Sequence, residues 1–177
     1  MRMKRRAAIA AVILVCFILQ STVFQALSLG SIAPNLMLIV TVSFGFMRGK
    51  RSGLWIGFFC GLLKDIFYGN LLGFYALIYL CIGYFAGCCC KIFYNEEIRV
   101  PLFLMAAGDL ISGGLVYFAQ FLMRGRINFF YYLGRIIIPE MIYTVLVTIV
   151  LYKILFILNN KLSELEMKER DSIWLRK

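Results

Sequence analysis

Six apolar runs make up most of this chain, and the short segments between them carry most of its cations. The runs are Ala7–Leu29, Ala33–Met47, Ser52–Phe67, Gly73–Ile92, Val100–Met123 and Ile136–Asn159. A helix needs about 20 residues to cross the hydrocarbon of a bilayer. The second and third runs are shorter than this, so we expect them to borrow flanking residues or to be enclosed by other helices. An arrangement with five spans, in which one short run does not cross, stays open.

The composition of the chain excludes an ordinary soluble domain. Of its 177 residues, 62% are hydrophobic and 16% are charged, against about 45–50% and about 25% in soluble proteins. The net charge of +10 would suit a nucleic-acid-binding protein. Here the cations lie between apolar runs, where they act as topology signals, so no nucleic acid is expected. The sequence predicts an all-α, polytopic membrane bundle of six transmembrane helices that is surrounded by membrane lipid.

The distribution of cations predicts the orientation in the membrane. With the N-terminus in the cytoplasm, all but four of the 19 lysines and arginines face inward. The four on the outer side are Lys64, Arg124, Arg126 and Arg135. We therefore expect a multi-pass membrane protein with both termini in the cytoplasm. The first apolar run is longer than the core of a signal peptide and is read as a retained helix.

Two segments outside the apolar runs are not expected to cross the membrane. Residues 1–160 are predicted to form the bundle and residues 161–177 a cytoplasmic tail, either a short amphipathic helix or a frayed segment. The outer segment Arg124–Arg135 mixes arginines with four consecutive aromatic residues. It is typical of an interfacial aromatic belt, and a docking patch for an external partner is the alternative.

Small residues recur at every fourth position through the third run. They are Gly49, Gly53, Gly57 and Gly61, and Asp65 takes the next step. Residues four apart share one helix face, and glycines there let a neighbouring backbone come close. This ladder predicts a helix-packing face inside the bundle or a partner-binding face outside it.

Carboxylates at membrane depth are the other candidate sites, because a charge in hydrocarbon must be paired, protonated or hydrated. Asp109 lies near the middle of the fifth run, and Glu140 lies in the first turns of the sixth. Arg135 and Lys64 are possible partners for Glu140 and Asp65. The interpretation stays open between structural pairs and functional groups.

Two further polar residues lie at the outer ends of spans. Gln20 precedes Ser21 and Thr22 near the end of the first span, and Asn35 follows Pro34 at the start of the second. Interhelical hydrogen bonds from such groups support packing, at about 0.6 kcal/mol each on average. Both residues are therefore possible intramembrane polar sites.

No residue pattern predicts catalysis, a metal or a cofactor. The chain has no histidine, and its six cysteines lack the paired spacing of a zinc site. Asp65 and Asp109 on two spans invite comparison with intramembrane aspartyl proteases, whose paired carboxylates share a proton. Residues 106–109 read Ala-Ala-Gly-Asp, without the glycine-x-glycine-aspartate signature. We expect a protein that is not an enzyme.

Three short motifs resemble the family of rod shape-determining proteins called MreD. They are Leu19–Val23, Pro34–Leu36, and the run from Gly57 to Asp65 with Gly69 and Leu72–Gly73 after it. The second departs from the family, which usually has an aspartate at the position of Asn35. The likeness extends over nearly the whole chain in length, span number and basic N-terminus.

The resemblance implies a non-enzymatic component of the bacterial elongation machinery, which maintains cell shape, and places it in the bacterial cytoplasmic membrane. It implies an MreC-like partner and, through that partner, MreB and a RodA–penicillin-binding protein pair that builds the lateral cell wall. It also implies a fold similar to the substrate-binding subunits of energy-coupling vitamin transporters. Such a transporter subunit is the alternative function, with Asp109 and the outer aromatic residues lining a substrate cavity.

Overall fold

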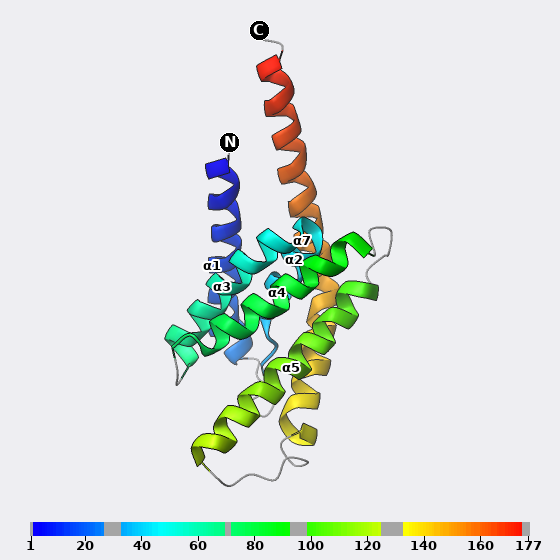
Figure 1. Cartoon of the computed structure of the whole chain (residues 1–177). Helices are drawn as coiled ribbons and strands as arrows, with labels where there is room; N and C mark the ends of the chain where they lie inside the picture. Colours follow the sequence, from blue (N-terminus) through cyan, green and yellow to red (C-terminus); the bar gives the residue numbers. More distant parts are fainter. Residues whose placement is uncertain (1, 27–32, 70–71, 93–98, 125–132, 175–177) are drawn as a thin grey trace.

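A computed structural model describes residues 2–26, 33–69, 72–92, 99–124 and 133–174, which form helices with short connections (Figure 1). The helices are α1 (Arg2–Ala26), α2 (Leu36–Arg48), α3 (Lys50–Tyr68), α4 (Phe74–Ile92), α5 (Arg99–Arg124) and α7 (Ile138–Trp174). A π-helical turn, η1 (Leu133–Ile137), leads into α7. The described residues contain no strand, so the predicted all-α fold is confirmed.

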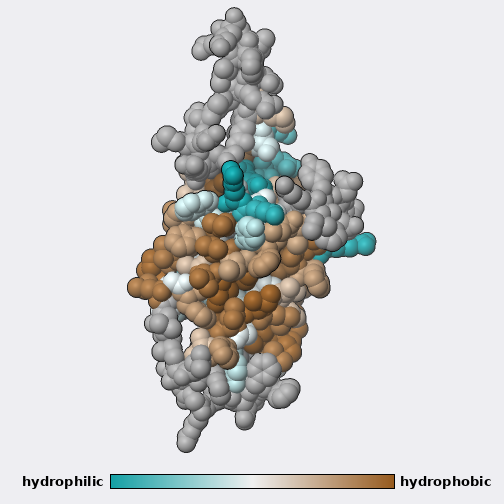
Figure 2. Space-filling view, in the orientation of Figure 1, coloured by the Kyte–Doolittle hydropathy of each residue, from teal (hydrophilic) through white to brown (hydrophobic). Residues whose placement is uncertain are grey.

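Three of these helices are long and apolar enough to cross a membrane. They contain the segments Ala7–Ala26, Arg99–Ala119 and Leu133–Glu164, and α2 and α4 hold shorter apolar stretches. In Figure 2, apolar side chains cover the middle of the visible face, and hydrophilic ones gather mainly at its upper edge. The chain is therefore a helical membrane protein, as its composition predicts.

The short helix α2 forms the centre of the molecule. Its 13 residues reach only about 20 Å, which is too short for a lipid-exposed span. Every residue from Leu36 to Phe46 is buried, and α2 contacts α1, α3, α4, α5 and α7. A helix that is apolar on all sides belongs in the interior, so the short second run is enclosed by protein rather than by lipid.

Helices α3 and α4 form an antiparallel pair whose backbones touch, and their contact is the most extensive in the described structure. A Cβ atom added at Gly53 would overlap the backbone carbonyl of Gly83, and one at Gly57 would overlap that of Tyr79. A Cβ at Gly61 would lie 2.5 Å from the Cα of Ala76. Residues four apart along α3 therefore pack against residues about four apart in the reverse direction along α4.

Both chain ends lie at the same end of the molecule, and α7 projects beyond the other helices there (Figure 1). Helix α7 runs unbroken from Ile138 to Trp174, so the structure shows no helix end at residue 160. The division into bundle and tail stays a prediction. The aromatic segment between Arg124 and Arg135 falls largely outside the described residues.

Candidate functional site

Asp65 caps a helix that is not its own. The residue lies near the end of α3 and is 1% exposed. Its Oδ1 accepts a hydrogen bond from the backbone N–H of Tyr75 at 2.9 Å. Its Oδ2 accepts from Ala76 at 2.9 Å and from Gly73 at 3.1 Å. These groups open α4, where N–H donors have no partner within the helix and the helix dipole favours a negative charge.

Asp65 therefore does not need Lys64 as a partner, and Lys64 contacts two tyrosines of α4 instead. Its Nζ donates to the hydroxyl of Tyr79 at 2.9 Å. The same nitrogen lies 4.7 Å from the ring centre of Tyr75 and 5.4 Å from that of Tyr79. A cation over aromatic rings gains about 2 kcal/mol when it is removed from water. The two tyrosines, four apart on α4, thus hold a charged side chain inside the bundle.

Asn35 joins this group to α5 and α7. Its Oδ1 accepts from the hydroxyl of Tyr79 at 2.7 Å, and its Nδ2 donates to Oδ1 of Asp109 at 3.3 Å. Its backbone N–H donates to the hydroxyl of Thr144 at 3.2 Å. Asn35 and Asp109 are 2% and 4% exposed. Because a buried polar group must be hydrogen-bonded to offset its desolvation, these contacts explain how four helical segments place polar side chains together.

Gln20 of α1 caps the start of α2, just as Asp65 of α3 caps the start of α4. Its side-chain oxygen Oε1 accepts from the backbone N–H of Met37, in the first turn of α2, at 3.1 Å. The N-cap residue Asn35 makes no side-chain capping bond to its own helix. The start of α2 is thus supported by α1 through Gln20 and by α7 through Thr144.

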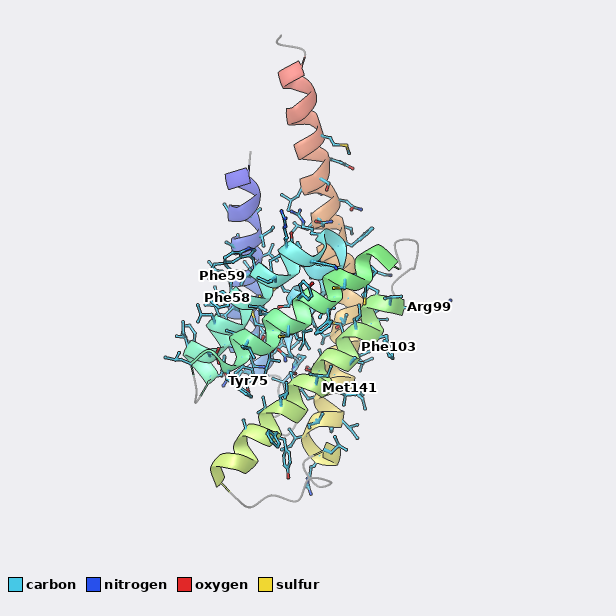
Figure 3. All side chains as sticks on the ribbon, in the orientation of Figure 1. Phe58, Phe59, Tyr75, Arg99, Phe103 and Met141 are labelled. Atoms are coloured by element: carbon cyan, nitrogen blue, oxygen red, sulfur yellow. The ribbon has the colours of Figure 1, made fainter. Side chains whose placement is uncertain are left out.

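A cavity of about 150 Å³ lies beside this polar cluster. Its lining residues come from the start of α2, the end of α3, the start of α4, the second half of α5, and η1 with α7. They are Asn35, Lys64, Tyr75, Ser112, Gly113, Val116, Ile136, Ile137 and Glu140. Figure 3 shows Tyr75 and Met141, which follows Glu140, in the half of the molecule away from the termini.

Glu140 lines this cavity. Arg135, the partner that the sequence suggested, has an interaction of its own in the structure. Glu140 lies close enough to Lys64 and Asp109 to interact with them electrostatically. The structure thus brings Glu140, Asp109 and Asn35 together around Lys64.

The glycines of the ladder have a different environment from its last member, Asp65. Gly53, Gly57 and Gly61 face α4 inside the chain, whereas Gly49 has a φ of 84° at the junction of α2 and α3, with open space at its Cβ position. Positive φ suits glycine because it has no Cβ.

The sequence predicted these glycines and the acidic residues as candidate sites, but it did not predict the hydrogen bonds of Tyr79 and Thr144. The i, i+4 spacing of Tyr75 and Tyr79 is the signal that was available.

Comparison with known proteins gives one match. A family model described as rod shape-determining protein MreD matches residues 1–162. Searches of curated proteins and of solved structures gave no match.

Proposed function

We propose, from the premise that the chain belongs to the MreD family of rod shape-determining proteins, that it scaffolds an MreC-like partner in the membrane. The family match confirms the resemblance seen in the sequence motifs and makes the chain a rod shape-determining membrane protein. Through the partner, the scaffold positions MreB and a RodA–penicillin-binding protein pair for lateral wall synthesis. In this role the protein acts without catalysis, in the bacterial cytoplasmic membrane, with both termini in the cytoplasm.

The observation that carries the proposal is the close-packed core of α2, α3 and α4. A Cβ at Gly45 would lie 2.9 Å from the carbonyl oxygen of Gly83 and 3.5 Å from the Cα of Gly53, so the three backbones meet at one point. Interiors packed this closely resist deformation. A stiff core of this kind suits a protein whose task is to hold partners in fixed positions.

The core also restricts where a partner can bind. Because α4 covers Gly53, Gly57 and Gly61, these glycines are available to a partner only if the α3–α4 pair opens. The opposite face of α3 carries Trp55 and Phe59, which are 61% and 51% exposed and stack at 6.3 Å. Figure 3 labels Phe59 and its neighbour Phe58 on this helix. Since aromatic residues dominate interface hot spots, we assign this face to the MreC-like partner.

Photocrosslinking in cells tests this assignment. Benzoylphenylalanine at position 59 is expected to crosslink to an MreC-like protein that mass spectrometry identifies. The matched control is position 103 on α5, where Phe103 is 75% exposed and lipid adducts alone are expected. Protein adducts at position 103 and none at position 59 would overturn the assignment of the face.

A complementation assay tests the function itself. Gly57→Leu is expected to abolish rod shape because the side chain must displace the α4 backbone. Gly114→Leu on α5, where a Cβ meets open space, is expected to preserve it. If the Gly57→Leu variant kept rod shape and still co-purified with the partner, the close-packed core would no longer support the proposal.

The size of the cavity weighs against the transporter alternative. At about 150 Å³ it is smaller than the roughly 300–1,000 Å³ typical of small-molecule sites. Native mass spectrometry of the purified protein separates the two functions, because a stoichiometric vitamin would favour transport.

A further inference from the structure

Asp109 is a buried carboxyl group with one oxygen left over. Its side chain lies in the middle of α5 and is 4% exposed. Its Oδ1 accepts a hydrogen bond from Nδ2 of Asn35 at 3.3 Å, whereas its buried Oδ2 has no hydrogen-bond partner among the described residues. An ionised carboxyl oxygen can only accept, and burying it without a donor is costly. A protonated oxygen needs an acceptor instead.

Such an acceptor lies beside Asp109. The hydroxyl group of Thr144 on α7 is close to the Asp109 carboxyl group. Thr144 donates its hydroxyl proton to the backbone carbonyl of Glu140 at 2.8 Å, and its oxygen accepts the backbone N–H of Asn35 at 3.2 Å. Because a hydroxyl oxygen has two lone pairs, Thr144 keeps one acceptor position and has no proton left to donate. It therefore suits a protonated Asp109 better than an ionised one.

The hydrogen bonds at the other oxygen fit the same state. Lys64 donates to the hydroxyl of Tyr79, Tyr79 donates to Asn35, and Asn35 donates to Oδ1 of Asp109. Every donor in this chain points toward Asp109. Oδ1 is thus an acceptor, like the carbonyl oxygen of a carboxylic acid, and the proton belongs on Oδ2.

The charges of the cluster also leave Asp109 over. The titratable groups that act on it are Lys64 of α3, Tyr79 of α4 and Glu140 of α7. Lys64 is a cation that acts on both acids. One ammonium group balances one carboxylate, and a second carboxylate at this depth would leave a net negative charge in the bundle. Arg135 of η1 is a further cation on an element packed against α5, and it has an interaction of its own.

We propose that Asp109 binds a proton at neutral pH and donates it, as a neutral carboxylic acid, to the hydroxyl oxygen of Thr144. Glu140 and Lys64 then remain as two opposite charges that compensate each other. The proton comes from water, which a neighbouring cavity of about 150 Å³ with polar lining residues is large enough to admit. Because the hydrogen bond joins α5 to α7, loss of the proton should weaken the contact between these helices.

Infrared spectroscopy tests the charge state directly, because a protonated carboxyl group absorbs apart from carboxylates. The full-length protein is purified in dodecyl maltoside, a detergent without a carbonyl group. At neutral pH we expect a protonated-carboxyl band that shifts when aspartate alone carries a heavy carbon isotope in its side-chain carboxyl group. Asp109→Asn should lose this band, and the matched Asp171→Asn, near the end of α7, should keep it.

Thermal unfolding measures the consequence for the bundle. The wild-type midpoint should fall from neutral to alkaline pH, because the folded state holds a proton that the unfolded state releases. Asp109→Asn has an acceptor oxygen and a donor nitrogen where the neutral acid has an acceptor and a donor. This variant should keep most of the stability at neutral pH, and its midpoint should fall less at alkaline pH. An equal fall in the two proteins would contradict the proposal.

Two spectroscopic results would overturn the proposal. One is a wild-type protein without an aspartate-sensitive band at neutral pH, and the other is a band that survives in Asp109→Asn. The first result concerns the unmodified protein, so a variant that fails to fold does not blur the outcome. Neither result touches the role in cell shape, which complementation tests separately.

Discussion

At the scale of single residues, two polar side chains of this protein, Asp65 and Gln20, serve the backbones of other helices. Asp65 of α3 accepts three backbone N–H groups at the start of α4, and Gln20 of α1 accepts one at the start of α2. In hydrocarbon, water cannot take these donors, and each unsatisfied group costs several kcal/mol. The sequence marked both residues as polar groups in apolar runs, but it did not reveal which backbone each would meet. Pairing rules for side chains do not predict contacts with the main chain of another helix.

Asp65→Ala should lower the free energy of unfolding by about 3 kcal/mol or more, because it leaves buried N–H donors unpaired. Asp65→Asn should lose less, since its one amide oxygen keeps part of the cap. Thermal unfolding in detergent, followed by circular dichroism, measures the loss. Glu164→Ala at an exposed site of α7 should change stability by less than about 0.5 kcal/mol. Equal stability of Asp65→Ala and the wild type would contradict the capping role.

Tyr79→Phe should cost about 1–3 kcal/mol, because the hydroxyl group both accepts from Lys64 and donates to Asn35. Tyr84→Phe on the same helix is the matched control, since its side chain is 41% exposed, and it should be nearly neutral. Chemical unfolding of both variants in the same detergent gives the comparison. A loss of similar size in the two would show that the Tyr79 hydroxyl does not organise the cluster.

At the scale of helices, the bundle is organised by the approach of α3 and α4. The four-residue ladder correctly indicates a face of close backbone approach, because side chains would prevent it. It carries no information about which helix approaches. The matching feature is on α4, where Gly83 and Gly87 face Gly53 and Lys50. A search for small residues four apart on every run would have suggested this pair.

Gly53→Ala and Gly83→Ala should each destabilise the protein, and the double variant should lose clearly less than the sum. Each glycine lies against the carbonyl group of the other, so the first methyl group already separates the helices. Thermal unfolding of the four proteins completes the cycle. Gly114→Ala, at an open position of α5, should be neutral or stabilising by up to about 1 kcal/mol. Strict additivity of the two losses would show that the glycines do not share one contact.

At the scale of the whole molecule, the apolar runs predicted the number of helices in the described residues, because cations and prolines delimit them. They predicted the approximate bounds of each helix except α7, which continues past Asn159 to Trp174. They did not predict that α2 lies at the centre. Lipid chains and protein interiors are similarly apolar, so hydropathy does not distinguish a helix surrounded by lipid from one surrounded by helices. The length of α2 was the available sign, since a helix of 13 residues is too short to cross alone.

The shared position of the two chain ends leads to a prediction about topology. Green fluorescent protein fused to the C-terminus should fluoresce in cells, because that protein matures in the cytoplasm. Alkaline phosphatase inserted between α3 and α4, at positions 70–71, should be active, because it requires the external compartment. An active phosphatase fused to the C-terminus would contradict the predicted orientation.

Helix α7 links the polar cluster to the end of the molecule where the chain termini lie. Its first turns carry Glu140 and Thr144 at the polar cluster, its middle holds Asn159 against Arg48 of α2, and it continues to Trp174. Its 37 residues make a lever of about 55 Å. If the lever pivots at the end near Glu140, a tilt of about 5° displaces the end at Trp174 by about 5 Å. In the predicted orientation, an occupant of the outer face of the bundle would thereby shift the position of this tip on the cytoplasmic side.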